Sequence, residues 1–276
     1  MVGVLMSKSL VEMVESSDQI VIGIGDEWNW VRRGIKSDPR YEQLINLCSD
    51  EEYKWLLPIV EFEYAYYNSD SKIEEAYRLL RKLVGDKKYF LVCDTVFQDA
   101  LLYGFDPAKS VYPCGNLMYL QTPDLNDPLI FSEKSIEFMQ LVADIHDIIS
   151  IGGIIDDTKT FVKPFQDGKE LYLNQKRKEY SNIDYNETAY MENWDVYKKF
   201  LTHTLNSKLL ILELGVGLDY PTVVRWPFEK IAFVNNKAHL VRVHEKLYHH
   251  TPEIEDKTDS IPMNSVDYIL QECKGL

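Results

Sequence analysis

The sequence lacks the features that define zinc proteins, disulfide-rich secreted proteins and membrane proteins. Its four cysteines are widely scattered and form no Cys-x-x-Cys pair, so we expect neither a zinc site nor a disulfide framework. No apolar run approaches the roughly 18 residues that a membrane helix requires. Glu12 and Glu15 are untypical of a secretory signal. These absences favour a cytoplasmic protein with no membrane partner.

Positive charge is also in short supply. The 276 residues include 30 Lys and Arg against 44 Asp and Glu, which gives a formal net charge of −14. Such a balance repels nucleic-acid phosphates and anionic lipids, so we expect no nucleic-acid partner. Hydrophobic residues make up 45% and charged residues 27%, which is ordinary for a globular protein that buries a substantial core.

The hydrophobic pattern indicates an α/β domain. Apolar runs predict strands at 19–25, 88–93, 110–113, 208–217, 230–234 and 239–243. Helical patterns are expected at 8–18, across 40–84, around 95–103, near 132–147 and near 189–204. We found no internal repeat and no low-complexity linker. The two ends of the chain should therefore form a nucleotide-type α/β domain, with irregular material inserted in the middle.

Two predicted strands each end in Gly-x-Gly, at Gly23-Ile24-Gly25 and at Gly215-Val216-Gly217. At the carboxyl end of a parallel strand, glycines allow the backbone to approach a diphosphate closely. Neither turn is a full GxGxxG, and each taken alone is more simply explained as an ordinary tight turn. Asp26 and Glu27 follow the first turn and would repel phosphate. The residues alone indicate a dinucleotide-like domain and leave the pocket open.

Longer segments resemble the macrodomain-linked (class M) sirtuins. Leu212-Glu213-Leu214-Gly215-Val216-Gly217 and the later Arg225-Trp226-Pro227-Phe228 are similar to that group's LELGVG motif and its continuation. Tyr89-Phe90-Leu91-Val92, with Gly104-Phe105-Asp106-Pro107 further on, is similar to the family's strand before its TTNVD motif and to a later GFD. The resemblance covers most of the chain, more weakly over 120–185.

The resemblance implies a Rossmann-like parallel sheet of the sirtuin and deoxyhypusine-synthase type, with a smaller inserted helical module. We expect one sirtuin-like domain over 1–276. Its Rossmann-like part would cover about 1–30, 85–117 and 206–276, and its smaller module about 31–84 and 118–205. NAD or ADP-ribose would be the ligand, contacted at Gly23, Gly25, Thr95, Phe97, Gly215, Val216, Gly217 and His244. By the same analogy, an active sirtuin or a lipoyl-carrier protein would be the partner.

The sequence departs from the family at the positions that perform its chemistry. Thr95 stands in place of the TTNVD asparagine, and Phe97 in place of the aspartate that binds the nicotinamide carboxamide. A phenyl ring cannot accept that hydrogen bond, and burying the carboxamide without a partner costs about 1–3 kcal/mol. Cys114 occupies the position of the His or Gln base, and an ordinary thiol is a poor base at neutral pH. The family's zinc cysteines are missing, with Thr122 near the first.

Three functions remain open from the sequence. We favour a catalytically degenerate binding or regulatory module over an enzyme. The second is a divergent ADP-ribosyltransferase or NAD hydrolase that uses Thr95 and Cys114, with deacylation the least expected reaction. The third is a protein-interaction scaffold without nucleotide, because Asp26, Glu27 and Trp28 would hinder a diphosphate.

Overall fold

The computed structural model describes residues 8–156, 160–178 and 180–276, and the chain divides into two compact units. We call them the sheet unit, formed by Met1–Trp28, Ser71–Pro113 and Tyr190–Leu276, and the inserted unit, formed by Asn29–Asp70 and Cys114–Ala189. These boundaries differ from the expected ones at two long helices. α5 (Ser71–Val84) and α8 (Met191–Thr202) group with the sheet and not with the smaller module.

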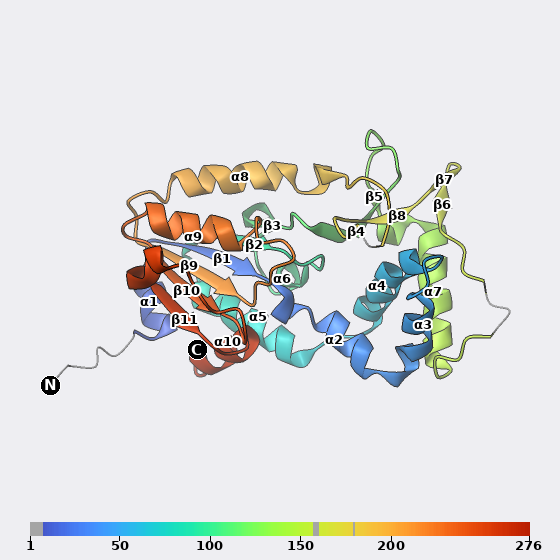
Figure 1. Cartoon of the computed structure of the whole chain (residues 1–276), viewed down its shortest axis with the longest axis horizontal. Helices are drawn as coiled ribbons and strands as arrows, with labels where there is room; N and C mark the ends of the chain where they lie inside the picture. The colour runs from blue at the N-terminus through green and yellow to red at the C-terminus, as the bar shows by residue number, and fades with distance from the viewer. Residues whose placement is uncertain (1–7, 157–159, 179) are drawn as a thin grey trace. The chain divides into compact units, whose positions relative to one another are not determined.

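The sheet unit contains six parallel strands in the order β11-β10-β9-β1-β2-β3 (Figure 1). Their bounds are β1 (Gln19–Ile24), β2 (Lys88–Cys93), β3 (Ser110–Val111), β9 (Leu209–Leu214), β10 (His239–Val243) and β11 (Thr258–Ile261). Counted along the chain, these strands follow the Rossmann order 3-2-1-4-5-6. The order reverses between β1 and β9. Ligands of such sheets bind beyond the carboxyl ends of the strands at this reversal.

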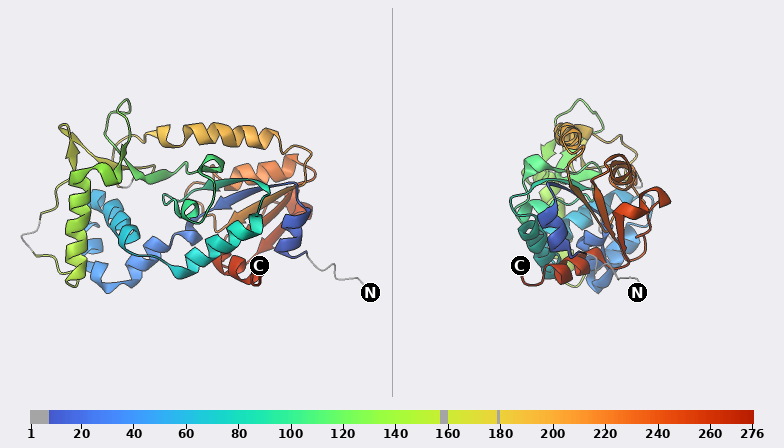
Figure 2. Two further views of the ribbon diagram at one scale, coloured as in Figure 1. Left: turned by 180° about the vertical axis from the view of Figure 1, so that it is seen from behind. Right: turned by 90° about the vertical axis from the view of Figure 1, so that its left-hand side faces the viewer.

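Helices cover both faces of the sheet, which explains the continuous apolar strands. Ile20, Val21 and Ile22 of β1 and Ile211 and Leu212 of β9 are fully buried. α8 and α9 (Arg225–Val234) lie on one face, and α1 (Leu10–Ser16), α5 and α10 (Ser265–Glu272) on the other (Figures 1 and 2). The short α6 (Asp99–Leu102) follows β2.

One predicted strand was wrong. Residues 230–234 form the second half of α9. The buried residues of this helix are Arg225, Phe228 and Ala232, which recur at helical spacing, whereas Phe233 and Val234 are exposed. A short apolar run was therefore mistaken for a buried strand, because its period could not be judged over five residues.

The inserted unit combines helices with small antiparallel sheets. Its helices are α2 (Trp30–Ser37), α3 (Glu42–Leu47), α4 (Leu57–Tyr67) and α7 (Ile136–Ser150). β4 (Gly115–Gln121) pairs with β5 (Ile130–Phe131) and β8 (Tyr172–Gln175), and β6 (Phe165–Gln166) pairs with β7 (Lys169–Glu170). Phe62 of α4 packs edge-on against Phe138 of α7, with 5.0 Å between ring centroids. In the described part of the chain, no helix is both long and apolar enough to cross a membrane.

Candidate functional site

The two glycine turns meet at the reversal point of the sheet. The Gly25 N–H donates to the Leu214 carbonyl at 3.0 Å. A Cβ placed on Gly25 would lie 2.4 Å from the Val216 Cα, so only glycine allows the two turns to pack together. Gly215 adopts a φ of +67°, a conformation that also favours glycine. The turns thus lie at the edge where ligands of such sheets bind. Gly25 and Gly215 are also required by the packing and the backbone conformation of the turns themselves.

Glu27 occupies hydrogen-bond donors at the carboxyl edge of the sheet between β1 and β9, the expected ligand-binding edge, which we call the crevice. It lies in the short 3₁₀ turn that follows β1. Its Oε1 accepts the Glu245 N–H at 2.8 Å, just after β10, and its Oε2 accepts the Ser265 N–H at 2.7 Å, at the first residue of α10. Backbone N–H groups at a helix start are typical anion ligands. The Glu27 carboxylate is therefore held as a bound anion would be.

Trp28 fixes the segment that carries Glu27. Its side chain is 1% exposed, and its Nε1–H donates to the Ser265 Oγ at 3.1 Å. The indole packs against Tyr77 of α5, with 4.6 Å between ring centroids. Trp28 is therefore a core residue of the sheet unit, and its burial holds the neighbouring Glu27 against α10.

His244, expected at the adenosine side, directly follows β10 at the carboxyl edge of the sheet. Its Nδ1 accepts the Lys246 N–H at 3.0 Å and the Leu247 N–H at 3.1 Å. Burial lowers the pKa of the imidazole, although Glu27 opposes this shift. The same Nδ1 lies 3.3 Å from Glu27 Oε1, so His244 contacts both the chain after β10 and the carboxylate of Glu27.

Asp94 is a site residue that the sequence reasoning missed. It follows β2 at the same edge, and its N–H donates to the Ile24 carbonyl at 3.1 Å. The residue is 9% exposed, and its buried Oδ1 has no hydrogen-bond partner among the described residues. Burial, and then the charges of Asp26, Glu213 and Asp219, raise the pKa of its carboxyl well above the usual range. A neutral acid here can donate a hydrogen bond to a ligand.

The other predicted site residues are buried, two in the sheet unit and one in the inserted unit. Thr95 and Phe97 lie after β2 in the sheet unit, where the Thr95 Oγ1 donates to the Phe97 carbonyl at 3.3 Å. Both are buried, at 7% and 8% exposure. Cys114 belongs to the inserted unit, where its side chain is fully buried and its carbonyl accepts the Lys176 N–H at 2.9 Å.

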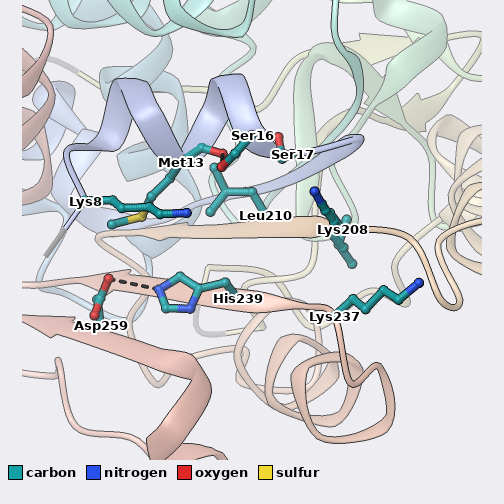
Figure 3. A pocket seen from close by; sticks show the side chains of 10 residues that line it. Lys8, Met13, Ser16, Ser17, Lys208, Leu210, Lys237, His239 and Asp259 are labelled. Carbon is teal, nitrogen blue, oxygen red and sulfur yellow. Dashed lines mark hydrogen bonds and ion pairs between the residues drawn. The ribbon is translucent and has the colours of Figure 1, made fainter.

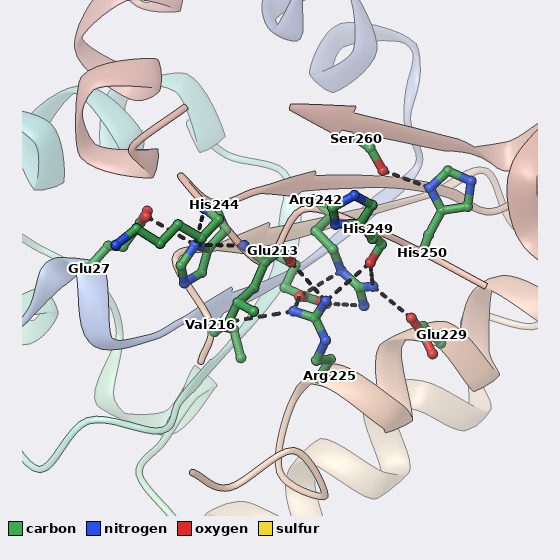
Figure 4. A network of polar contacts seen from close by, with 12 residues as sticks. Glu27, Glu213, Val216, Arg225, Glu229, Arg242, His244, His249, His250 and Ser260 are labelled. Carbon is green, nitrogen blue, oxygen red and sulfur yellow. Dashed lines mark hydrogen bonds and ion pairs between the residues drawn. The ribbon is translucent and has the colours of Figure 1, made fainter. Parts of the chain in front are cut away.

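A buried ionic network supports the chain that borders the crevice (Figure 4). Glu213 of β9 forms ion pairs with Arg242, whose Nε lies 2.7 Å from Oε1, and with Arg225, whose Nη1 lies 3.2 Å from the same oxygen. The Arg242 Nη2 donates to Glu213 Oε2 at 2.8 Å. Arg225 Nη2 also donates to the carbonyls of Leu247 and His249. Glu213 and Arg225 belong to the LELGVG segment and its continuation, where the sequence alone indicates no role for either. Their role here is to hold the segment after β10.

The described residues include no group of three or more His, Cys, Asp or Glu side chains arranged to hold a metal ion. The network around Glu213 instead contains two carboxylates and two guanidinium groups, with Glu229 Oε1 2.6 Å from Arg242 Nη1. The arrangement at the carboxyl edge can therefore hold a polar ligand through backbone donors, the Asp94 carboxyl and the glycine turns.

Comparison with solved structures identifies the fold class. A mutant Sir2 homologue in complex with ADP-ribose matches with a TM-score of 0.54, at 11% identity, over 98% of this chain and 96% of that chain. A second mutant of a Sir2 homologue, also in complex with ADP-ribose, matches at 12% identity with the same TM-score and coverage. A structure on sirtuin substrate affinity matches at 14% identity with a TM-score of 0.50, over 96% of each chain.

The chain thus has the sirtuin fold, a Rossmann-like α/β sheet with a smaller separate module. No protein-family model matches the sequence, and no curated protein matches it. The particular subgroup suggested by the LELGVG segment therefore stays a prediction.

Proposed function

We propose that this protein is a non-catalytic sirtuin-fold module that binds ADP-ribose or NAD in the crevice between β1 and β9, in competition with its own Glu27. The carboxylate of Glu27, held by the N–H groups of Glu245 and Ser265, carries the proposal. Donors that hold a carboxylate at the start of a helix can hold a phosphate or a ribose hydroxyl in its place. Solved Sir2 homologues of this fold are complexes with ADP-ribose.

The lack of catalysis is proposed from the residues after β2 and from Cys114. Phe97 offers a carboxamide no side-chain acceptor, and the Thr95 hydroxyl is already bonded to the Phe97 carbonyl. The Cys114 side chain is fully buried, which removes it from solvent and from substrates. A base and an accessible nucleophile are what the reaction would require.

A nucleotide-free interaction scaffold is the second candidate, favoured by the acidic rim of the crevice. Asp26 and Asp219 are exposed beside the turns. A diphosphate entering this rim meets like charge. If Glu27 never leaves its donors, the crevice stays closed and the sheet unit serves only as a rigid support.

The discriminating experiment is calorimetric titration of the wild type and of Glu27→Ala with ADP-ribose and with NAD. The substitution frees two N–H donors and removes one negative charge. We therefore expect Glu27→Ala to bind ADP-ribose at least tenfold more tightly, which corresponds to about 1.4 kcal/mol. Glu245→Ala is the matched control: it removes the same charge from an exposed neighbour and leaves the backbone donors held.

Each outcome decides between the candidates. Binding by the wild type that tightens in Glu27→Ala alone supports a nucleotide module gated by this carboxylate. Absence of binding in both folded proteins contradicts the proposal and leaves the scaffold. Release of nicotinamide from NAD by the wild type would refute the non-catalytic part, whatever the affinities.

A further inference from the structure

A second pocket lies at the opposite, amino-terminal edge of the sheet (Figure 3). Its volume is about 420 Å³, and it is bordered by α1 on one side and by the first residues of β9 and β10 on the other. Ten residues line it: Lys8, Met13, Ser16, Ser17, Lys208, Leu209, Leu210, Lys237, His239 and Asp259. All belong to the sheet unit, and none belongs to the crevice described above.

The pocket concentrates positive charge in a strongly acidic protein. Within the described part of the chain, the ammonium groups of Lys8, Lys208 and Lys237 are bonded to no carboxylate. Some lysines elsewhere pair with a carboxylate, as in Lys72–Asp267 at 2.7 Å and Lys169–Asp127 at 2.6 Å. Three like charges around one pocket repel each other unless an anion joins them. Their grouping is therefore unexpected in a chain with a formal net charge of −14.

The carboxylates nearby are already engaged. Asp259 lies 2.9 Å from His239 Nε2, and Asp18 Oδ2 accepts the backbone N–H of Lys208 at 2.9 Å. The serine hydroxyls are also used as donors, because Ser16 donates to the Met13 carbonyl and Ser17 to the Val14 carbonyl. Recognition of an anion here depends on the lysines, which act as flexible point charges.

The floor of the pocket is apolar. Leu209 and Leu210 are buried, at 1% and 2% exposure, and the Met13 thioether lies across from them on α1. Figure 3 shows the Lys8 ammonium beside Leu210 and Lys208 on the other side of that leucine. A ligand that fits both features carries an anionic group for the lysines and an apolar body for the floor.

We propose that this pocket binds a small phosphorylated compound with an apolar body. The proposal is independent of the nucleotide crevice, because it rests on different residues at the other edge of the sheet. Phosphate suits the site because two or three ammonium groups can share its charge and its three oxygens.

The test uses phenyl phosphate and inorganic phosphate as probes, titrated into the full-length protein by calorimetry. We expect phenyl phosphate to bind more tightly than inorganic phosphate, because its ring can contact the leucine floor. Lys208→Glu and Lys237→Glu should each weaken phenyl phosphate binding at least tenfold. Lys230→Glu is the matched control, since it makes the same charge change on an exposed position of α9 and should leave the affinity unchanged.

The result can overturn the proposal in three ways. Wild-type protein that binds neither probe at millimolar concentration has no such site. Equal losses of phenyl phosphate affinity in Lys208→Glu and Lys230→Glu would show that binding depends on the overall charge of the protein and not on this pocket. Equal affinity for phenyl phosphate and inorganic phosphate would show that the apolar part of the ligand makes no favourable contact in the pocket. Thermal melts of each variant without ligand establish that a loss of binding is not a loss of fold.

Discussion

At the scale of single residues, Asp94 combines burial, an unpartnered oxygen and acidic neighbours. Its raised pKa means that the folded state holds a proton that the unfolded chain releases above about pH 3.9. The contribution of the protonated Asp94 to the free energy of unfolding is therefore complete below that pH and is lost as the pH rises toward the folded-state pKa. We predict that the melting temperature of Asp94→Asn, minus that of the wild type, becomes more positive between about pH 4 and pH 8.

The measurement is a series of thermal melts of both proteins across that pH range. Glu245→Gln is the control, because it removes one exposed carboxylate that is not among the charges that raise the pKa of Asp94. If the difference in melting temperature between Asp94→Asn and the wild type stays constant with pH, Asp94 has the same pKa in the folded and the unfolded state, and the prediction is wrong.

Several residues of the crevice could be predicted from the sequence and others could not. The glycine turns could, because strand ends and Gly-x-Gly patterns are local. The contacts of Glu27 could not, because its partners Glu245 and Ser265 lie more than 200 residues further along the chain. From its position after the first glycine turn, Glu27 was expected only to repel phosphate. In the structure its carboxylate instead accepts two backbone N–H groups at the crevice.

At the scale of elements, the packing of α9 on β1 depends on Gly23. A Cβ at this position would lie 2.3 Å from Val224 Cγ1 and 2.8 Å from Phe228 Cε2, both fully buried residues. We predict that Gly23→Ala destabilises the protein by about 1–3 kcal/mol, the usual cost of overpacking a core. Urea unfolding measures this loss as a lower transition midpoint.

The double variant Gly23→Ala/Val224→Ala tests the cause of that loss. It removes the nearest clashing methyl group and should recover part of the stability, because the two changes occupy the same space. Purely additive losses would show that the clash is not the reason that position 23 is glycine.

The elements themselves were predicted where the pattern is long. β1, β2 and β9 were expected from continuous apolar runs, and the structure confirms them. The run at 230–234 failed because helical spacing becomes visible only when Arg225 and Phe228 are included. The assignment of α5 and α8 to the sheet unit depends on tertiary packing, which the sequence pattern does not report.

At the scale of the whole molecule, the topology could be predicted from the apolar strands and glycine turns near both ends of the chain, which are typical of a Rossmann-like sheet. The structure has that strand order, with β1 and β9 at its centre. Function could not be carried over in the same way, since one fold accommodates many activities. The distribution of charge adds what the topology omits. It gives the two edges of one sheet opposite character, with acids around the crevice and lysines at the second pocket.

This difference predicts opposite responses to salt for the two proposed sites. Salt screens exposed charges, with a Debye length of about 30 Å at 0.01 M and about 8 Å at 0.15 M. ADP-ribose must approach the acidic rim, so screening reduces repulsion and its affinity should hold or rise with salt. Phenyl phosphate is attracted by Lys8, Lys208 and Lys237, so its affinity should fall. Dissociation constants measured at both salt concentrations test this directly. If the affinity for ADP-ribose falls steeply with salt, that ligand binds among lysines and not at the acidic rim. If the affinity for phenyl phosphate does not change with salt, the three lysines do not form its binding site.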